Sequence, residues 1–229
     1  MEYIISGIKE AFTLLLSFHE ETYNIIFLSV FVSLSSTCIA FFIGCPIGLI
    51  FAIKEFRMKR LATRILYTLM GMPPVIIGLV VALVLSRKGP LGEMELLFTP
   101  IAMIIAQTLL VIPIIAGIIF NNFKDRAKDV ISVSTTLGAD KLNTFLLLIK
   151  EMRIYVLIAI VTGFGRAISE VGAVMIVGGN IKGHTRVMTS FIAMNNSMGN
   201  YSQAIAMGLV LICLSFVTNS ILYFVGMGD

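Results

Sequence analysis

The chain has 229 residues, of which 58% are hydrophobic and 13% are charged, and its formal net charge is +4. This apolar fraction is well above that of soluble domains, and long apolar runs recur along the sequence. Composition therefore predicts a single integral membrane domain over 1–229 and excludes a separate soluble enzyme domain. We also expect no metal site, because the cysteines and histidines show no ligand spacing. They are Cys38, Cys45, Cys213, His19 and His184.

The first 20 residues predict an amphipathic helix that lies at the membrane interface. Ile4, Ile5, Ile8 and Phe12 recur at helical spacing, and the sequence opens with an acidic residue instead of the basic region of a cleaved signal. A short additional transmembrane span over 1–20 is the alternative interpretation.

Five transmembrane helices are predicted after this segment. Their approximate ranges are 23–53, 64–85, 98–120, 154–177 and 202–225. Each has about the 20 residues that a helix needs to cross a bilayer. Continuous apolar runs favour helices over strands, because lipid tolerates no unpaired backbone groups. The expected fold class is therefore an all-α integral membrane protein.

Glycine and proline interrupt the predicted spans. Such residues allow either close helix packing or hinges for a protein that changes shape, and both interpretations stay open. The residues concerned are Gly44, Pro46, Gly48, Pro73, Pro74 and Pro113.

The distribution of lysine and arginine predicts the orientation in the membrane. Segments 54–64 and 121–153 lie on one side of the five spans and carry eleven basic residues, against five on the other side. Cytoplasmic loops are enriched in such residues. We therefore expect both segments in the cytoplasm, with the N-terminus outside and the C-terminus inside.

The segment 121–153 predicts two helices separated by a glycine. A helix is expected from Asp125 to Thr136, a break at Gly138, and a second helix capped by Asp140. A helical element of this kind on the cytoplasmic face is a docking surface for a partner protein. The residues expected to couple to that partner are Ser134, Thr135, Thr136, Leu137, Gly138, Ala139, Asp140 and Lys141.

Arg166 and Glu170 are the charged residues inside the predicted spans. Their i, i+4 spacing places them on one face of a helix. Each charge costs about 2.5–3.5 kcal/mol at the centre of a bilayer, so the pair should face the interior of the bundle or a hydrated cavity. Either it locks the bundle as a structural ion pair, or it lines or gates an anion path.

The turn that follows, Gly178–Thr185, is similar to the phosphate-binding pattern G-x4-G-K-[ST], but His184 occupies the lysine position. Nucleotide binding is therefore not expected in this chain. A tight outer loop that closes a pore or seats a partner is preferred to an anion cradle. The outer-loop residues are Gly178, Gly179, Asn180, Lys182, Gly183, His184, Thr185 and Arg186.

Two motifs resemble those of ABC-importer permeases. Gly138 stands at the glycine of the cytoplasmic E-A-A-x3-G motif, whose acid and alanines are replaced by Ser132, Val133 and Ser134. The second motif, F-x-R-A-x-x-E-x-G followed by G-N-I and a threonine, is similar to the permeases for molybdate, sulfate and tungstate. It is matched by Phe164, Arg166, Ala167, Glu170, Gly172, Gly179, Asn180, Ile181 and Thr185.

This resemblance covers about residues 25–225 and implies a type I ABC-importer permease fold. It implies import of an oxyanion, with tungstate expected and molybdate or sulfate as alternatives. The implied partners are a second copy of the chain, two cytoplasmic ATPase subunits that use ATP and magnesium, and an extracytoplasmic binding protein. No cofactor is expected in this chain, and no nucleic acid partner.

Two other classes of function fit the sequence poorly. A membrane enzyme is disfavoured, because the predicted spans hold no nucleophile–base pair and no metal motif. An ATP-independent anion carrier or channel is disfavoured by the elaborate segment 121–153.

Overall fold

The computed structural model describes residues 6–9, 13 and 20–227. Within these residues the ordered elements are helical, which confirms the predicted all-α fold class. The elements are α2 (Glu20–Ile53), α3 (Lys59–Met70), α4 (Pro74–Leu85), the 3-10 turn η1 (Gly92–Met94), α5 (Pro100–Thr136), α6 (Lys141–Glu151), α7 (Arg153–Ile168), α8 (Gly172–Gly178), α9 (Met188–Ser197) and α10 (Tyr201–Met227). The interfacial helix predicted over 1–20 falls largely outside the described residues.

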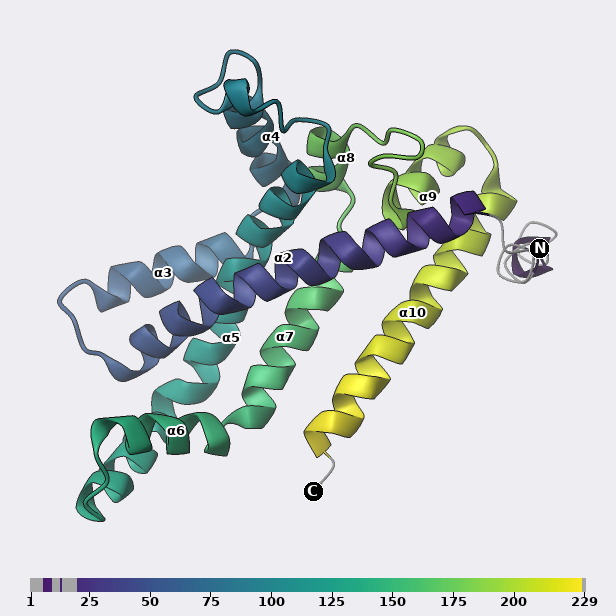
Figure 1. Cartoon of the computed structure of the whole chain (residues 1–229). Coiled ribbons are helices and arrows are strands. Elements are labelled where there is room, and N and C mark those ends of the chain that lie inside the picture. The colour runs from purple at the N-terminus through teal and green to yellow at the C-terminus, as the bar shows by residue number, and fades with distance from the viewer. Residues whose placement is uncertain (1–5, 10–12, 14–19, 228–229) are drawn as a thin grey trace.

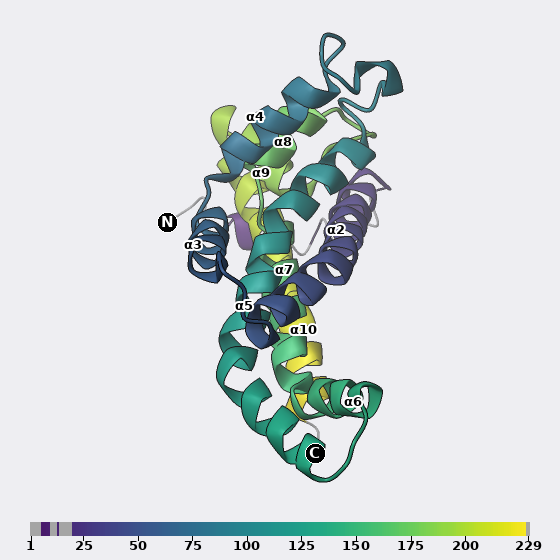
Figure 2. The same ribbon diagram turned by 90° about the vertical axis from the view of Figure 1, so that its left-hand side faces the viewer.

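Helix α5 is the centre of the bundle, and it contacts α2, α3, α4, α6, α7 and α8. Figure 1 shows α2 crossing α5 and α7. Helix α10 lies beside α7, and α6 lies at the lower end. Turned by 90°, the molecule is elongated, with α6 at one end and the connection from α4 to α5 at the other (Figure 2).

Three helices in the described residues are long and apolar enough to cross a membrane by themselves, namely α2, the Pro100–Lys124 part of α5, and the Tyr201–Ser220 part of α10. Two further spans arise if each bent pair is counted as one, with α3 and α4 meeting at 94° and α7 and α8 at 58°. The predicted spans 64–85 and 154–177 are therefore not single continuous helices.

The first of these breaks follows from two consecutive prolines. Pro73 is the N-cap of α4, and Pro74 is its first residue. Proline lacks a backbone N–H and suits the first turn of a helix, but it cannot continue a preceding one. The 94° bend is the physical result, and it explains why one apolar run became two short helices.

The largest helix contact joins α2 to α5 through small residues. A Cβ atom added at Gly44 would lie 2.8 Å from the Ile112 carbonyl oxygen, and one at Gly48 would lie 2.6 Å from that of Ala116. The two backbones therefore approach closely at both glycines, as in other small-xxx-small membrane contacts. Pro46 lies between them on the exposed side of α2, and Pro113 is buried inside α5.

Substitution of Gly48 by alanine is expected to destabilise the protein by about 1–3 kcal/mol, because the new methyl group meets backbone that cannot turn aside. Gly208→Ala in α10 is the matched control, since no atom lies within 4 Å of its added Cβ. That variant should be neutral or slightly stabilised. Thermal unfolding in detergent measures both, and equal midpoints would contradict the close contact.

Candidate functional site

A break between α7 and α8 holds the two intramembrane charges. Helix α7 ends at Ile168 and α8 begins at Gly172, with Glu170 in between. One carboxylate oxygen of Glu170 accepts from the Ala173 N–H at 3.1 Å and so caps α8. The other lies 3.6 Å from Nη2 of Arg166. The Glu170 carboxylate thus links the last turn of α7 to the first turn of α8.

The structure brings Arg166 and Glu170 together, but not on one face of a continuous helix as the sequence predicted. Glu170 lies beyond the end of α7, which stops at Ile168 with Ser169 as its C-cap. The two side chains also differ in burial, with Glu170 at 4% exposure and Arg166 at 39%. Glu170 is therefore fixed in the interior, whereas the Arg166 side chain stays partly accessible.

Buried polar side chains around this break were not identified from the sequence. Gln107 of α5 accepts from the Ser36 hydroxyl of α2 and donates to the backbone oxygen of Ala167. Thr189 of α9 donates to the backbone oxygen of Glu170 at 2.8 Å. A glutamine inside the apolar run "IIAQTLL" was the available signal, since polar residues in membrane spans usually face the interior.

The outer loop after α8 is a compact turn that uses its own backbone donors. The amides of His184, Thr185 and Arg186 all donate to the Ile181 oxygen. The buried Thr185 hydroxyl donates to Gly178 and accepts from the Ile181 amide. These donors are occupied within the loop, so the geometry is that of a closed turn instead of an open anion cradle.

Gly178 lies at the end of α8, and left-handed backbone at Gly179, Asn180 and Gly183 shapes the rest of the loop. Lys182 and Arg186 lie 2.8 Å and 3.5 Å from the carboxylate oxygens of Glu21, at the start of α2. The side chains of Lys182, Arg186 and His184 line one side of a cavity of about 430 Å³, which Glu20, Glu21 and Asn24 line on the other. The loop is therefore tied to α2 by ion pairs.

The predicted helix–glycine–helix element is present. Gly138 adopts a left-handed conformation with φ +80°, and its amide and that of Ala139 donate to Thr135 and Ser134. These two bonds form a Schellman motif, which favours glycine at this position. The Asp140 carboxylate accepts from the Asn143 amide at 2.7 Å and caps α6 as predicted.

The first helix of this element is not separate, because α5 runs without interruption from Pro100 to Thr136. Leu137 stands at the tip with 81% of its surface exposed. Val133, Leu142, Phe145 and Leu146 are exposed near it, whereas Ser134 is buried against Thr144. Exposed apolar side chains gathered at a projecting tip are typical of a protein-docking surface. The side chain of Lys141 lies outside the described residues.

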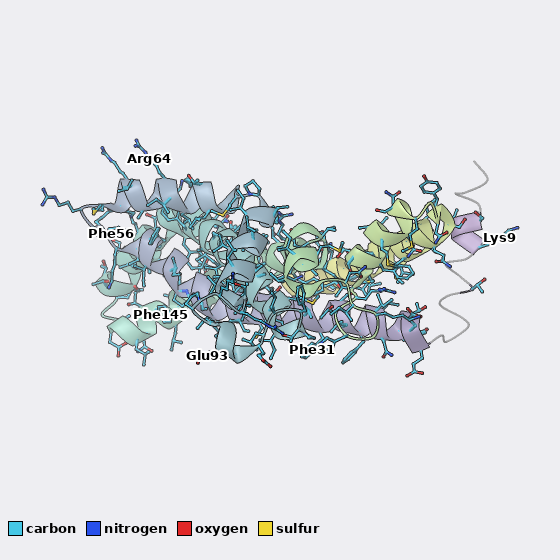
Figure 3. All side chains as sticks on the ribbon, turned by 90° about the horizontal axis from the view of Figure 1, so that it is seen from above. Lys9, Phe31, Phe56, Arg64, Glu93 and Phe145 are labelled. Carbon is cyan, nitrogen blue, oxygen red and sulfur yellow. The ribbon has the colours of Figure 1, made fainter. Side chains whose placement is uncertain are left out.

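Segment 54–58 and α6 belong to the same end of the molecule. In Figure 3, Phe56, Arg64 and Phe145 lie at one end, and Lys9 lies at the other. The two basic segments that the sequence assigned to one side of the membrane are therefore on one side of the fold.

This bundle of long and broken apolar helices with a projecting helical tip has a counterpart among solved structures. A solved structure of the MetNI methionine ABC transporter in inward-facing conformations has this fold. It matches with a TM-score of 0.75 over 92% of this chain and 96% of that chain, at 15% sequence identity. This likeness establishes the type I importer permease fold.

The chain belongs to the family of binding-protein-dependent transport system inner membrane components, whose model matches residues 44–226. It is 55% identical to the tungstate uptake system permease protein TupB of Peptoclostridium acidaminophilum, over 97% of this chain and 98% of that protein. It is 35% identical to TupB of Campylobacter jejuni, over 96% and 94% respectively. The chain is therefore a membrane-embedded permease subunit, a class without its own ATPase site.

Proposed function

We propose that this chain forms, with a second copy of itself, the membrane pathway of an ATP-driven tungstate importer. The observation that carries the proposal is the exposed apolar tip around Leu137, which sits at the end of α5, the helix at the centre of the bundle. A self-contained carrier or channel has no need of such a tip. One copy has too few spans to enclose a pathway, so two copies are proposed.

The proposed substrate rests on similarity to the two tungstate permeases, above all on 55% identity over nearly the whole of both chains. Tungstate and molybdate have nearly the same size and charge. Molybdate and sulfate are therefore the substrates to test beside it.

In this proposal two cytoplasmic ATPase subunits hold ATP and magnesium and dock at the element from Ser134 to Lys141. An extracytoplasmic binding protein delivers the anion on the side of the outer loop 178–186. The N-terminus is outside and the C-terminus is cytoplasmic, in accord with the basic residues of 54–64 and 121–153. ATP binding closes the ATPase pair, and the docked tips carry that movement into the spans.

Arg166 is the residue proposed to face the anion in the pathway. Its side chain is partly accessible, whereas Glu170 is buried and bonded to the start of α8. The guanidinium attracts an oxyanion and the neighbouring carboxylate offsets part of that attraction, so a bound anion can still be released. Glu170 is then the anchor, and Arg166 is the group that meets the substrate.

The test is transport by the purified complex in proteoliposomes. With the ATPase subunit, the binding protein and ATP-magnesium present, tungstate should accumulate and its binding protein should stimulate ATP hydrolysis. Omission of ATP should abolish uptake, and uptake without ATP would indicate a carrier or channel instead. Greater accumulation of molybdate or sulfate than of tungstate would replace the proposed substrate and leave the importer role intact.

A further inference from the structure

Gln107 is a buried amide in α5, with 3% of its surface exposed. Its Oε1 accepts from the Ser36 hydroxyl of α2 at 2.8 Å, and its Nε2 donates to the Ala167 carbonyl of α7 at 2.9 Å. We propose that Gln107 is a positioning residue for translocation, which holds the last turn of α7 and thereby fixes the place of Arg166. This inference rests on the pathway role proposed for Arg166.

Only one orientation of the amide satisfies both neighbours. The Ala167 carbonyl can only accept, so an N–H of Gln107 must face it. Oε1 then faces the Ser36 hydroxyl, whose one proton is shared with the Val32 carbonyl at 2.5 Å. The reverse orientation would place two acceptors against each other inside an apolar bundle, which is costly. Gln107 therefore joins α2, α5 and α7 in one defined arrangement.

The bond to Ala167 is made in the last turn of α7, where the helix offers its carbonyls few partners of its own. The carbonyls of the last helical turn have no amide one turn ahead to pair with. The Ala167 oxygen accepts from the Glu170 amide at 3.2 Å and from Gln107 at 2.9 Å. The second bond is the one that comes from another helix. It therefore sets the position of the end of α7 relative to α5.

Arg166 directly precedes Ala167, so the direction of its side chain follows that of this turn. Thr189 fixes the backbone of Glu170 from the other side of the break. Without Gln107, the end of α7 keeps its local bonds and its apolar packing but loses this hydrogen bond to α5. The distance of 3.6 Å between Arg166 and Glu170 is then no longer imposed by the bundle.

Gln107→Leu removes both bonds and nearly keeps the volume of the side chain. We expect the maximal transport rate to fall by about tenfold, because the Ala167 carbonyl loses its bond from α5 and the guanidinium is displaced. The concentration of binding protein that gives half-maximal rate should stay unchanged, since Gln107 is buried away from any docking surface. Transport at equal amounts of reconstituted protein measures both quantities.

Thr108→Val is the matched control. The Thr108 hydroxyl donates to the Ser36 carbonyl at 3.4 Å, so it links the same two helices, α2 and α5, without reaching α7. This variant should keep the transport rate within about twofold, because its bond is long and weak. An equal loss in both variants would show a general packing defect and overturn the positioning role.

A double-variant cycle separates positioning from mere stabilisation. If Gln107 acts through Arg166, then Gln107→Leu combined with Arg166→Gln should transport no less than Arg166→Gln alone. Losses that multiply, or a normal rate in Gln107→Leu, would overturn the proposal.

Hydrogen exchange of the amides in 165–173 gives a readout that does not depend on the substrate. Exchange should rise in Gln107→Leu and stay unchanged in Thr108→Val. Unchanged exchange in Gln107→Leu contradicts the positioning role itself. Failure of the unmodified complex to transport any oxyanion counts against the proposed function instead.

Discussion

Replacement of both Arg166 and Glu170 by glutamine is expected to lower oxyanion transport by about 100-fold while the protein stays folded. Glutamine at 170 keeps an oxygen that can accept from the Ala173 amide, so the cap of α8 survives. Removal of both charges together leaves no unpaired charge in the membrane, and such replacements are often neutral for stability. Uptake into proteoliposomes and thermal unfolding measure the two effects.

Glu170→Ala is the comparison that shows what the pair contributes to structure. It removes the cap of α8 and leaves Arg166 without a counter-charge, so it should cost about 2–4 kcal/mol of stability. If the double glutamine variant transports normally at normal expression, Arg166 has no role in the pathway. If it unfolds as readily as Glu170→Ala, the pair serves structure alone.

Leu137→Asp is expected to abolish association with the ATPase subunit and to leave the permease itself stable. Leu137 is almost fully exposed at the tip, so no internal packing is lost. A buried charge at the centre of the proposed interface should weaken binding by at least about 2 kcal/mol, or roughly 30-fold. Co-purification of the ATPase subunit and ATP hydrolysis by the complex are the measurements.

Met198→Asp provides the matched control for the docking prediction. Met198 is also an exposed apolar residue, 65% accessible, but it follows α9, in the turn before α10, far in sequence from the tip. This variant should retain the ATPase subunit. Retention by Leu137→Asp as well would mean that the tip is not the docking surface.

Local signals in the sequence were sufficient to predict the structure of the tip between α5 and α6. Glycine at 138 and aspartate at 140 determine a helix end and a helix start by short-range hydrogen bonds, and the structure has both where they were predicted. Sequence also predicted the all-helical fold and the range of α2, because one long apolar run has no competing interpretation.

The breaks within the two bent helix pairs were harder to predict, because the apolar content of a segment does not reveal the direction in which its helices run. Residues 64–85 satisfy the length of a span whether or not Pro73 and Pro74 turn the chain by 94°. Glu170 fits helical spacing from Arg166, yet its carboxylate caps the next helix instead. The contacts of Gln107 could not be predicted, because its partners are 71 and 60 residues away in the sequence and only the fold brings them together.

The uninterrupted course of α5 has a mechanical consequence. From Gln107 to Leu137 the helix extends about 45 Å, at roughly 1.5 Å per residue. One continuous helix thus has the exposed tip around Leu137 at one end and, near the other, the amide that holds the end of α7. A tilt of about 5° about the level of Gln107 moves the tip by about 4 Å over such a length. Conversely, a displacement imposed on the tip reaches α7 as a small rotation. The distance from Gln107 to Leu137 sets the ratio of displacement to rotation.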